Sequence, residues 1–216
     1  MNTDYARMQM VYQQIRGWNV YDEDVLDMLR TLPREDFVPA EYASLAFADI
    51  AVPLSHGEFM MTPMLEGRLL QALGLRGAET VLEIGTGSGF MTACLAKLGA
   101  HVTSIDIHAD FIDAAGRKLD DAGIDNVELL KMDATQELPD GKFDAIAVTG
   151  SIQTFDPRYV EALNAHGRLF VVVGDAPSME AKLIERTDTN DWQTISLFET
   201  DLKPLVHGAL PPQFSF

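Results

Sequence analysis

The stretch VLEIGTGSGF, Val81 to Phe90, decides the fold class, because three closely spaced glycines join a short apolar run to a helical pattern. The apolar run before the glycines predicts a buried strand, and the spacing after them predicts a helix. Glycine lets the backbone turn sharply and lets a ligand approach it closely. The start of the helix offers unpaired N–H groups to that ligand. The stretch therefore indicates a strand, a ligand-binding loop and a helix.

The sequence on either side of the glycine loop alternates between strand and helix patterns. Apolar runs predict strands over residues 80–84, 101–107, 127–132 and 143–149, and helices over 88–98 and 109–122. Such alternation indicates βαβ units and a parallel sheet. Runs over 167–174, 180–187 and 192–200 predict further strands, and no helix-length gap separates the last two. The predicted fold is therefore α/β, a doubly wound sheet that is mostly parallel and has antiparallel final strands.

The first third of the sequence is helical and then irregular. Apolar residues in 5–15 and 22–32 are spaced like helical faces, the first of them formed by Met8, Val11, Tyr12 and Ile15. Residues 34–61 show no such period, and Thr62-Pro63 then predicts a helix start. We expect a helical N-terminal extension with a substrate loop over residues 1–61, and one compact ligand-binding domain over residues 62–216.

Composition limits the classes of partner and compartment. The chain of 216 residues has a net charge of −17, which would repel phosphate backbones and anionic lipid, so neither nucleic acid nor a membrane is expected as a partner. The single cysteine, Cys94, excludes an internal disulfide framework and fits a reducing compartment. No apolar run is long enough to span a membrane, and no signal peptide is visible. These features predict a cytoplasmic protein.

An acidic residue at the end of the second predicted strand indicates that the ligand contains a nucleoside. Asp106 stands roughly 20 residues after Gly85, the first glycine of the loop, a spacing at which an acid accepts hydrogen bonds from ribose hydroxyls. Two more acids, Glu83 and Asp133, end the neighbouring strands. Glu83 suits the ammonium group of a methionine moiety, and Asp133 can face an adenine amino group. The three acids together match a cationic ligand without phosphate, S-adenosylmethionine.

The spacing of the glycines separates this cofactor from a dinucleotide. Nicotinamide-dependent dehydrogenases use G-x-G-x-x-G, whereas this loop reads G-x-G-x-G over Gly85, Gly87 and Gly89. An acid such as Glu83 would also be poorly placed beside a pyrophosphate. The pattern therefore disfavours a dehydrogenase.

The stretch VLEIGTGSGFMTACLAKLGAHVTSID resembles the S-adenosylmethionine-dependent methyltransferases, and among them the protein-L-isoaspartate O-methyltransferase family. The flanking segments VLDMLRTLPREDFVPAEY, AFADIAVPL and GRLFVVVG resemble the same family, so the likeness covers roughly residues 8–175. It implies a Rossmann-like methyltransferase sheet, an enzyme that uses S-adenosyl-L-methionine, and a function in protein repair. It also implies that the cofactor pocket is lined by Glu83, Gly85, Thr86, Gly87, Ser88, Gly89, Asp106, Ile107, Asp133 and Ala134.

The loop before residue 62 departs from the family pattern. That pattern is G-x-G-Q-T-I-S, a variable residue and proline, and this chain reads SHGEFMMTP from Ser55 to Pro63. Ser55 stands at the first glycine, Glu58 at the glutamine, Phe59 at the threonine and Met61 at the serine. The resemblance places these positions beside the methyl acceptor. It makes Ser55, His56, Glu58, Met61 and Thr62 the candidate catalytic residues.

The departure changes which acceptor the loop suits. A side-chain carboxylate is already ionised at neutral pH and needs position and hydrogen-bond donors rather than a base. Ionised Glu58, Phe59 and Met61 cannot donate, and a negative charge nearby would repel the acceptor by about 1–4 kcal/mol. Ser55, His56, Thr62 and backbone N–H groups remain as donors. The loop by itself predicts a poor site for a carboxylate and a better wall for an apolar or cationic acceptor.

Three hypotheses follow for the function. The first is methylation of an isoaspartyl carboxylate in damaged protein or peptide substrates. The second is a methyltransferase of the same fold with a different, less anionic acceptor, including a small molecule. The third is a protein that binds S-adenosylmethionine without turnover. The sequence indicates no oligomeric state.

Histidines, a serine and the aromatic tail give further indications about the site. The five histidines show no pair at metal-ligand spacing, so no metal is expected. Ser151 follows the fourth strand of the sheet, where the family's substrate loop runs. The aromatic tail, with Phe214 and Phe216, predicts either a frayed end or docking over the pocket.

Overall fold

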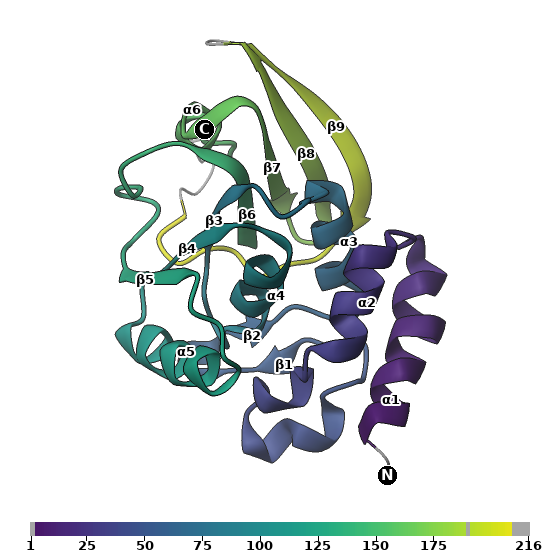
Figure 1. The fold of residues 1–216 in the computed structure, drawn as a ribbon. Coiled ribbons are helices and arrows are strands. Elements are labelled where there is room, and N and C mark those ends of the chain that lie inside the picture. The colour runs from purple at the N-terminus through teal and green to yellow at the C-terminus, as the bar shows by residue number, and fades with distance from the viewer. Residues whose placement is uncertain (1–2, 189–190, 209–216) are drawn as a thin grey trace, which may run out of the picture.

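A computed structural model describes residues 3–188 and 191–208 and has one seven-stranded sheet at its centre (Figure 1). The strand order is β5-β4-β3-β6-β7-β8-β9. The strands are β3 (Thr80–Ile84), β4 (His101–Asp106), β5 (Val127–Lys131), β6 (Phe143–Ile152), β7 (Leu163–Asp175), β8 (Ser178–Asp188) and β9 (Asp191–Thr200). The first five pair in parallel, and β8 and β9 are antiparallel. The predicted fold class is confirmed.

Helices cover both faces of the sheet, and the sheet separates the core into two apolar clusters, one on each face. The helices are α3 (Pro63–Leu73), α4 (Phe90–Leu98), α5 (Ala109–Asp121) and the short α6 (Pro157–Glu161). Successive side chains of a strand point to opposite faces, so Val81 of β3 lies in the cluster with α3 and α4, whereas Leu82 and Ile84 lie in the cluster with α6. The same alternation turns Glu83 toward α4.

The N-terminal segment adds a helical layer beside α3 and α4 (Figure 1). It comprises α1 (Thr3–Gln9), a π-helical turn η1 (Met10–Ile15), the 3-10 turn η2 (Arg16–Trp18) and α2 (Glu23–Thr31). Two further 3-10 turns, η3 (Arg34–Asp36) and η4 (Ala40–Leu45), lead away from α2. The helices contribute to the same apolar cluster as α3 and α4.

The buried face of the first helical segment differs from the α-helical prediction. Met10, Val11 and Ile15 are buried, whereas Met8 and Tyr12 are each 44% exposed. Met10 and Ile15 are five residues apart, which is the hydrogen-bond period of the π-helix and not of the α-helix. An α-helical period therefore assigns Met8 and Tyr12 to the wrong face.

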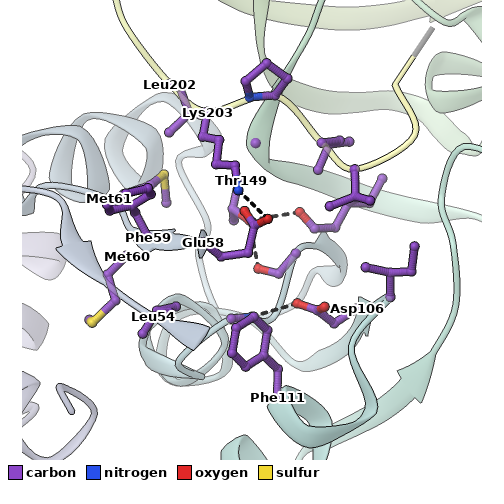
Figure 2. Close-up of a pocket in the computed structure, with 18 of the residues that line it drawn as sticks. Leu54, Glu58, Phe59, Met60, Met61, Asp106, Phe111, Thr149, Leu202 and Lys203 are labelled. Atoms are coloured by element: carbon purple, nitrogen blue, oxygen red, sulfur yellow. Dashed lines mark hydrogen bonds and ion pairs between the residues drawn. The ribbon is translucent and has the colours of Figure 1, made fainter. Parts of the chain in front are cut away.

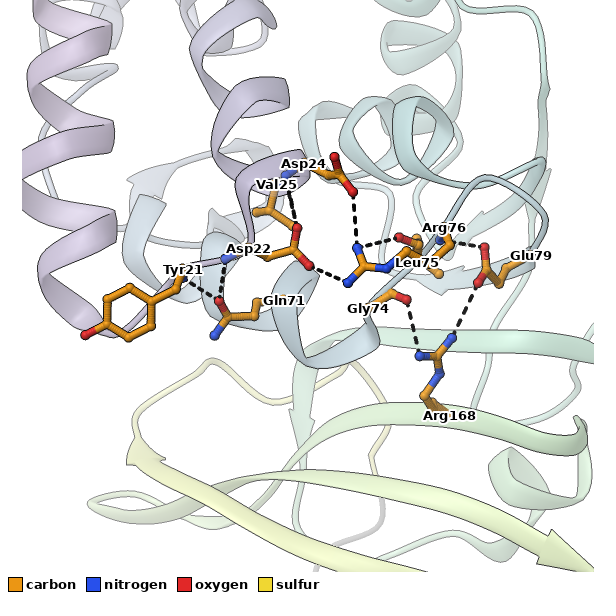
Figure 3. Close-up of polar contacts among 10 residues, drawn as sticks. All are labelled: Tyr21, Asp22, Asp24, Val25, Gln71, Gly74, Leu75, Arg76, Glu79 and Arg168. Carbon is orange, nitrogen blue, oxygen red and sulfur yellow. Dashed lines mark hydrogen bonds and ion pairs between the residues drawn. The ribbon is translucent and has the colours of Figure 1, made fainter.

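A polar network fastens α2 to α3 and to the sheet (Figure 3). The Asp22 carboxylate caps α2 by accepting hydrogen bonds from the Asp24 and Val25 N–H groups, and it pairs with Arg76 at 2.8 Å. The Gln71 side-chain oxygen accepts from the Tyr21 and Asp22 N–H groups. The guanidinium of Arg168, on β7, donates to the Gly74 carbonyl at 3.2 Å.

The segment SHGEFMMTP forms a small hairpin and a helix start. Strands β1 (Val52–Pro53) and β2 (Phe59–Met60) pair antiparallel around the 3-10 turn η5 (Ser55–Gly57). His56 in that turn has a φ of 59°, in the left-handed region. The Thr62 hydroxyl accepts from the Leu65 N–H and Pro63 is in the first turn, so the predicted start of α3 is confirmed.

None of the described helices is long and apolar enough to cross a membrane. Phe214 and Phe216 lie outside the described residues.

Candidate functional site

A cavity of about 560 Å³ opens at the carboxyl ends of the parallel strands. Its walls come from the β1–β2 hairpin, the glycine loop, the ends of β4, β5 and β6, and the segment after β9 (Figure 2). The strand order reverses at β3, which lies between β4 and β6. Ligands of doubly wound folds bind at such a reversal point, outside the carboxyl ends of the strands. The position of the cavity is therefore that of a ligand site.

The glycine loop approaches β6 too closely for a side chain. Gly85 has a φ of 102°, and a Cβ added there would lie 2.2 Å from the Thr149 hydroxyl oxygen. That hydroxyl is placed to donate to the carbonyl oxygens of Ile84 and Gly85, at 2.9 and 2.7 Å. At the other end of the loop, a Cβ on Gly89 would lie 2.9 Å from Ala115 Cβ of α5. Glycine is required at both positions by close packing.

Asp106 ends β4 and lies against the glycine loop on the cavity wall. One carboxylate oxygen accepts from the Gly87 N–H and the other from the His108 N–H, each at 2.9 Å. Burial raises the pKa of this carboxyl, although both hydrogen bonds lower it. The group can accept further hydrogen bonds from ligand hydroxyls in the cavity, as expected for a ribose-binding residue.

Asp133 follows β5 and also lines the cavity. One of its oxygens accepts from the N–H and hydroxyl of Thr135, and the other lies 2.9 Å from His207 Nδ1. Burial raises the pKa of Asp133, but the hydrogen bonds from His207 and Thr135 outweigh it, so the net pKa is lowered. Ile107 and Ala134 line the cavity beside the two acids and supply apolar wall. The arrangement suits a flat apolar ring with polar edges.

Glu83 occupies a different position from the one expected. It is fully buried and is not among the described residues that line the cavity. One carboxylate oxygen accepts from the Thr92 and Ser104 hydroxyls, at 2.5 and 2.6 Å, beneath α4. Burial raises the pKa of Glu83 to about 8. Glu83 therefore lies under the loop and supports its shape through one oxygen, while its other oxygen has no hydrogen-bond partner among the described residues, and a contact with a ligand's ammonium group stays a prediction.

Three other residues expected at the cofactor also lie outside the cavity lining. The Thr86 hydroxyl lies 2.6 Å from the Ser104 hydroxyl, in the network that holds Glu83. The Ser88 hydroxyl accepts from the Phe90 N–H at the start of α4. Gly89 packs on α5. The expected cofactor residues that do line the cavity are Gly85, Gly87, Asp106, Ile107, Asp133 and Ala134.

The hairpin divides the candidate catalytic residues into two groups. Glu58, Met61 and Thr62 line the cavity, together with Phe59 and Met60, whereas Ser55 and His56 are exposed and do not. Met60 and Met61 are buried, and Phe59 is 49% exposed. Met60 and Met61 therefore form cavity wall and core at the same time, whereas Phe59 contributes to the wall alone.

His56 contacts the start of α5. Its Nε2 lies 2.9 Å from the Asp110 carboxylate, and its ring stacks on that of His108 with centroids 4.0 Å apart and an angle of 3°. The hydrogen bond to His56 lowers the pKa of Asp110. One nitrogen or oxygen from each of these three residues lies within 4.8 Å of the others, a proximity that sequence spacing did not reveal. Because the rings are parallel, their in-plane lone pairs run side by side and do not converge on one metal position.

A lysine that sequence reasoning missed lies opposite the hairpin. Lys203 Nζ is 2.5 Å from a Glu58 carboxylate oxygen and donates to the Gly57 carbonyl at 2.7 Å (Figure 2). Lys203 belongs to the segment after β9, 145 residues from Glu58 in the chain. Nothing in the residues around position 203 marks it as a cavity residue. The expectation that Glu58 presents an uncompensated charge is thus corrected by the structure.

Ser151 holds that segment in place. Its N–H donates to the Lys203 carbonyl, its carbonyl accepts from the Leu205 N–H, each at 2.9 Å, and its hydroxyl donates to the Leu202 carbonyl at 2.7 Å. Ser151 is fully buried. It therefore positions the C-terminal wall of the cavity and does not face an acceptor.

Comparisons with known proteins agree with the geometry. The chain matches the model of the protein-L-isoaspartate(D-aspartate) O-methyltransferase family over residues 6–209. The protein-L-isoaspartate O-methyltransferase of Koribacter versatilis is 33% identical over 201 residues, 93% of this chain and 90% of the relative. That of Methanoculleus marisnigri is 35% identical over 202 residues, 93% of this chain and 91% of the relative.

A solved structure from Plasmodium falciparum has the same fold. It is described as a protein-L-isoaspartate O-methyltransferase in complex with S-adenosyl-L-homocysteine. It aligns with a TM-score of 0.78 and 19% identity over 92% of this chain and 97% of its own.

Proposed function

The chain belongs to the protein-L-isoaspartate(D-aspartate) O-methyltransferase family, and from this premise we propose that it methylates the carboxylate of damaged aspartyl residues in proteins or peptides. Members of the family are enzymes that use S-adenosylmethionine, and this chain is a methyltransferase of that kind. The cofactor supplies an electrophilic methyl group when bound.

The observation that carries the cofactor part of the proposal is the charge of the cavity, and the family carries the acceptor part. Glu58, Asp106, Asp133 and Asp201 all line it, and Lys203 is the one lysine or arginine among the described lining residues. A phosphate-bearing cofactor would meet four acids and one lysine that is already paired with Glu58, whereas a cationic, phosphate-free cofactor is favoured by the acids.

The residues present fit this cofactor. Asp106 would accept hydrogen bonds from the ribose hydroxyls, because its carboxylate faces the cavity while backbone N–H groups hold it. Ile107 and Ala134 would flank the adenine, and Asp133 would accept from its amino group. Glu83 would act indirectly, by holding the glycine loop through Thr92 and Ser104.

The acceptor requires position and donors from the protein. Its carboxylate is ionised at neutral pH, so no base is needed, and the task is to align one oxygen with the methyl group. Met60 and Met61 form an apolar wall there, and the Thr62 hydroxyl accepts from the Leu65 N–H and still carries a proton that it can donate. Cys94, the single cysteine, is free and buried, and the same proposal includes a cytoplasmic location because a chain without an internal disulfide fits a reducing compartment.

The test is methyl transfer to an isoaspartyl peptide and to the matched aspartyl peptide, with cofactor binding measured on the same sample. We expect transfer to the isoaspartyl peptide alone. Cofactor binding without transfer to either peptide would overturn the proposed substrate but not the family.

A second acceptor class is favoured by one observation. Phe59, Met60 and Met61 line the hairpin side of the cavity, and Phe59 and Met61 stand where the family pattern has hydrogen-bond donors. An acceptor with an apolar or less anionic methylation site would suit that wall. Transfer to such compounds, in the absence of transfer to the isoaspartyl peptide, would support this class.

A further inference from the structure

The ion pair of Glu58 and Lys203 joins two walls of the cavity. Glu58 comes from the turn between β1 and β2, and Lys203 comes from the segment after β9. In Figure 2 the two side chains point toward one another across the cavity, close to Thr149. The pair is therefore located where the hairpin, the end of β6 and the C-terminal segment meet.

The backbone on both sides of the pair is well anchored. Ser151 bonds to the residues on either side of position 203 and to Lys203 itself. On the hairpin side, the Leu54 N–H donates to the Glu58 carbonyl at 2.7 Å, and the Glu58 N–H donates to the Ser55 carbonyl at 3.0 Å. The lysine therefore reaches the cavity from a fixed base.

The ammonium group has donor capacity left for a ligand. It carries three N–H donors, and its acceptors among the described residues are the Gly57 carbonyl and the Glu58 carboxylate. The Lys203 side chain is 38% exposed, so a substrate that enters from solvent can reach it. The family pattern's donors are absent at positions 58, 59 and 61. Lys203 is the one lysine or arginine among the described residues that line the cavity.

We propose that Lys203 binds the acceptor carboxylate during methyl transfer and that Glu58, with the Gly57 carbonyl, orients the ammonium group for it. This inference rests on the proposed function, because it names the side chain that binds the carboxylate methylated in that reaction. Glu58 then has a positioning role, because it acts through Lys203 and does not donate to the substrate.

Methyl transfer to a carboxylate oxygen needs no proton transfer, so the Lys203 ammonium group can keep its proton during the step. One acceptor oxygen accepts a hydrogen bond from Lys203 Nζ while the other forms the new bond to the methyl carbon. The bond from methyl to sulfur breaks, and its electron pair remains on sulfur. The negative acceptor and the positive sulfonium become a neutral ester and a neutral thioether, so no proton is transferred. Lys203 stays protonated throughout.

The main experiment compares the wild type with Lys203→Met and Lys203→Arg on the isoaspartyl peptide. A hydrogen bond to a charged group contributes enough for the Lys203→Met change to raise KM or lower kcat/KM by about tenfold to a hundredfold. Lys203→Arg should restore most of the activity. The affinity for S-adenosylhomocysteine, measured by calorimetry, should stay near the wild-type value in both variants.

A second measurement separates recognition of the carboxylate from a structural role. Binding of the isoaspartyl peptide is compared with binding of its amidated analogue, with S-adenosylhomocysteine present and no turnover. The wild type should prefer the carboxylate, and Lys203→Met should lose that preference. Equal preference in both proteins would overturn the inference.

A third variant tests the role of Glu58. In Lys203→Met the Glu58 carboxylate loses its partner and repels the substrate, so Glu58→Gln combined with Lys203→Met should recover part of the activity. If the double variant recovers no activity, repulsion of the substrate by an unpaired Glu58 is excluded. Lys182→Met is the matched control, because Lys182 pairs with Glu180 at 3.0 Å on β8, outside the cavity lining. It should leave both kinetics and peptide preference unchanged.

The outcomes distinguish the two proposals. A wild type that binds cofactor but does not methylate the isoaspartyl peptide overturns the proposed function. A wild type that methylates it, with Lys203→Met equally active, overturns the role of Lys203 alone.

Discussion

Arg34 and Glu66 form a bidentate ion pair inside the protein, with Nε to Oε2 and Nη2 to Oε1 both at 3.0 Å. The same guanidinium donates to the carbonyl oxygens of Met61, at 2.9 Å, and Ala46, at 2.7 Å. Arg34 is fully buried and Glu66 nearly so. The pair therefore links the N-terminal turns to α3 and fixes the backbone of Met61 at the cavity wall.

Breaking this pair should destabilise the protein strongly. Arg34→Met leaves the Glu66 carboxylate buried without its cation and two carbonyls without their donor, a loss of about 3–5 kcal/mol in the free energy of unfolding. Arg16→Met is the control, because Arg16 pairs with Glu23 at 3.3 Å on the surface and should cost at most about 1 kcal/mol. Urea denaturation of the two variants checks this. Similar losses of stability in the two variants would contradict the inference that the buried pair of Arg34 and Glu66 contributes more to stability than a surface ion pair.

Asp106→Ala should weaken cofactor binding. Ribose hydroxyls left without an acceptor in a buried site cost roughly 1–3 kcal/mol of binding free energy. Calorimetry with S-adenosylmethionine and S-adenosylhomocysteine measures the loss, and Asp120→Ala, an exposed acid on α5, should bind like the wild type. An unchanged affinity in Asp106→Ala would mean that the ribose lies elsewhere.

Glu83→Gln should change the pH dependence of stability. The pKa of Glu83 is about 8 in the folded protein against an ordinary 4.5, so between these values the folded state holds a proton that the unfolded state releases. The wild type therefore loses stability as pH rises from about 5 to 8. The variant lacks this loss, and its stability relative to the wild type should grow over that range and level off above it.

Urea denaturation at pH 5, 7 and 8.5 measures the difference. Glu128→Gln, an exposed acid on β5, serves as the control and should follow the wild type at every pH. A Glu83→Gln curve parallel to that of the wild type would show that the buried carboxyl does not titrate in this range.

Asp22→Ala should destabilise α2 by about 1 kcal/mol at neutral pH, because it removes the helix cap. Burial raises the pKa of Asp22, but the hydrogen bonds from Arg76 and from the Val25 and Asp24 N–H groups outweigh it, and the net pKa is below 3.8. Its contribution is thus present above pH 3.8 and is lost as pH falls through the lower folded value. Thermal unfolding measured from pH 7 downward should show a difference from the wild type that is full at pH 7 and shrinks as pH falls below 3.8. Asp24→Ala, whose side chain is 72% exposed, should show little difference at any pH in that range.

Local pattern determined the architecture of this protein. Apolar runs of strand length, helices between them and the glycine loop are properties of neighbouring residues, and they specify a parallel βαβ sheet because few other arrangements bury those runs. The same reasoning located Asp106 and Asp133, since residues that follow parallel strands meet at one edge of the sheet. Both acids line the cavity.

The local sequence pattern did not predict which face of a strand or helix a given residue occupies, because a shift of one residue changes that face. Glu83 stands one residue before the end of β3, and strand alternation turns it beneath α4, away from the cavity. The π-helical turn shifts the buried face from Met8 and Tyr12 to Met10. A side chain's direction reverses with each residue of a strand, so an approximate strand end does not determine which face it occupies.

Tertiary structure alone decided the charge on the hairpin side of the cavity. Glu58 by itself predicts repulsion of a carboxylate, and only the return of the chain after β9 brings Lys203 to it. Ser151 fixes that return through three hydrogen bonds to residues 202–205. The charge at a site depends on every segment that packs there, including segments 145 residues apart in the chain, whereas a sequence motif reports only its own neighbourhood.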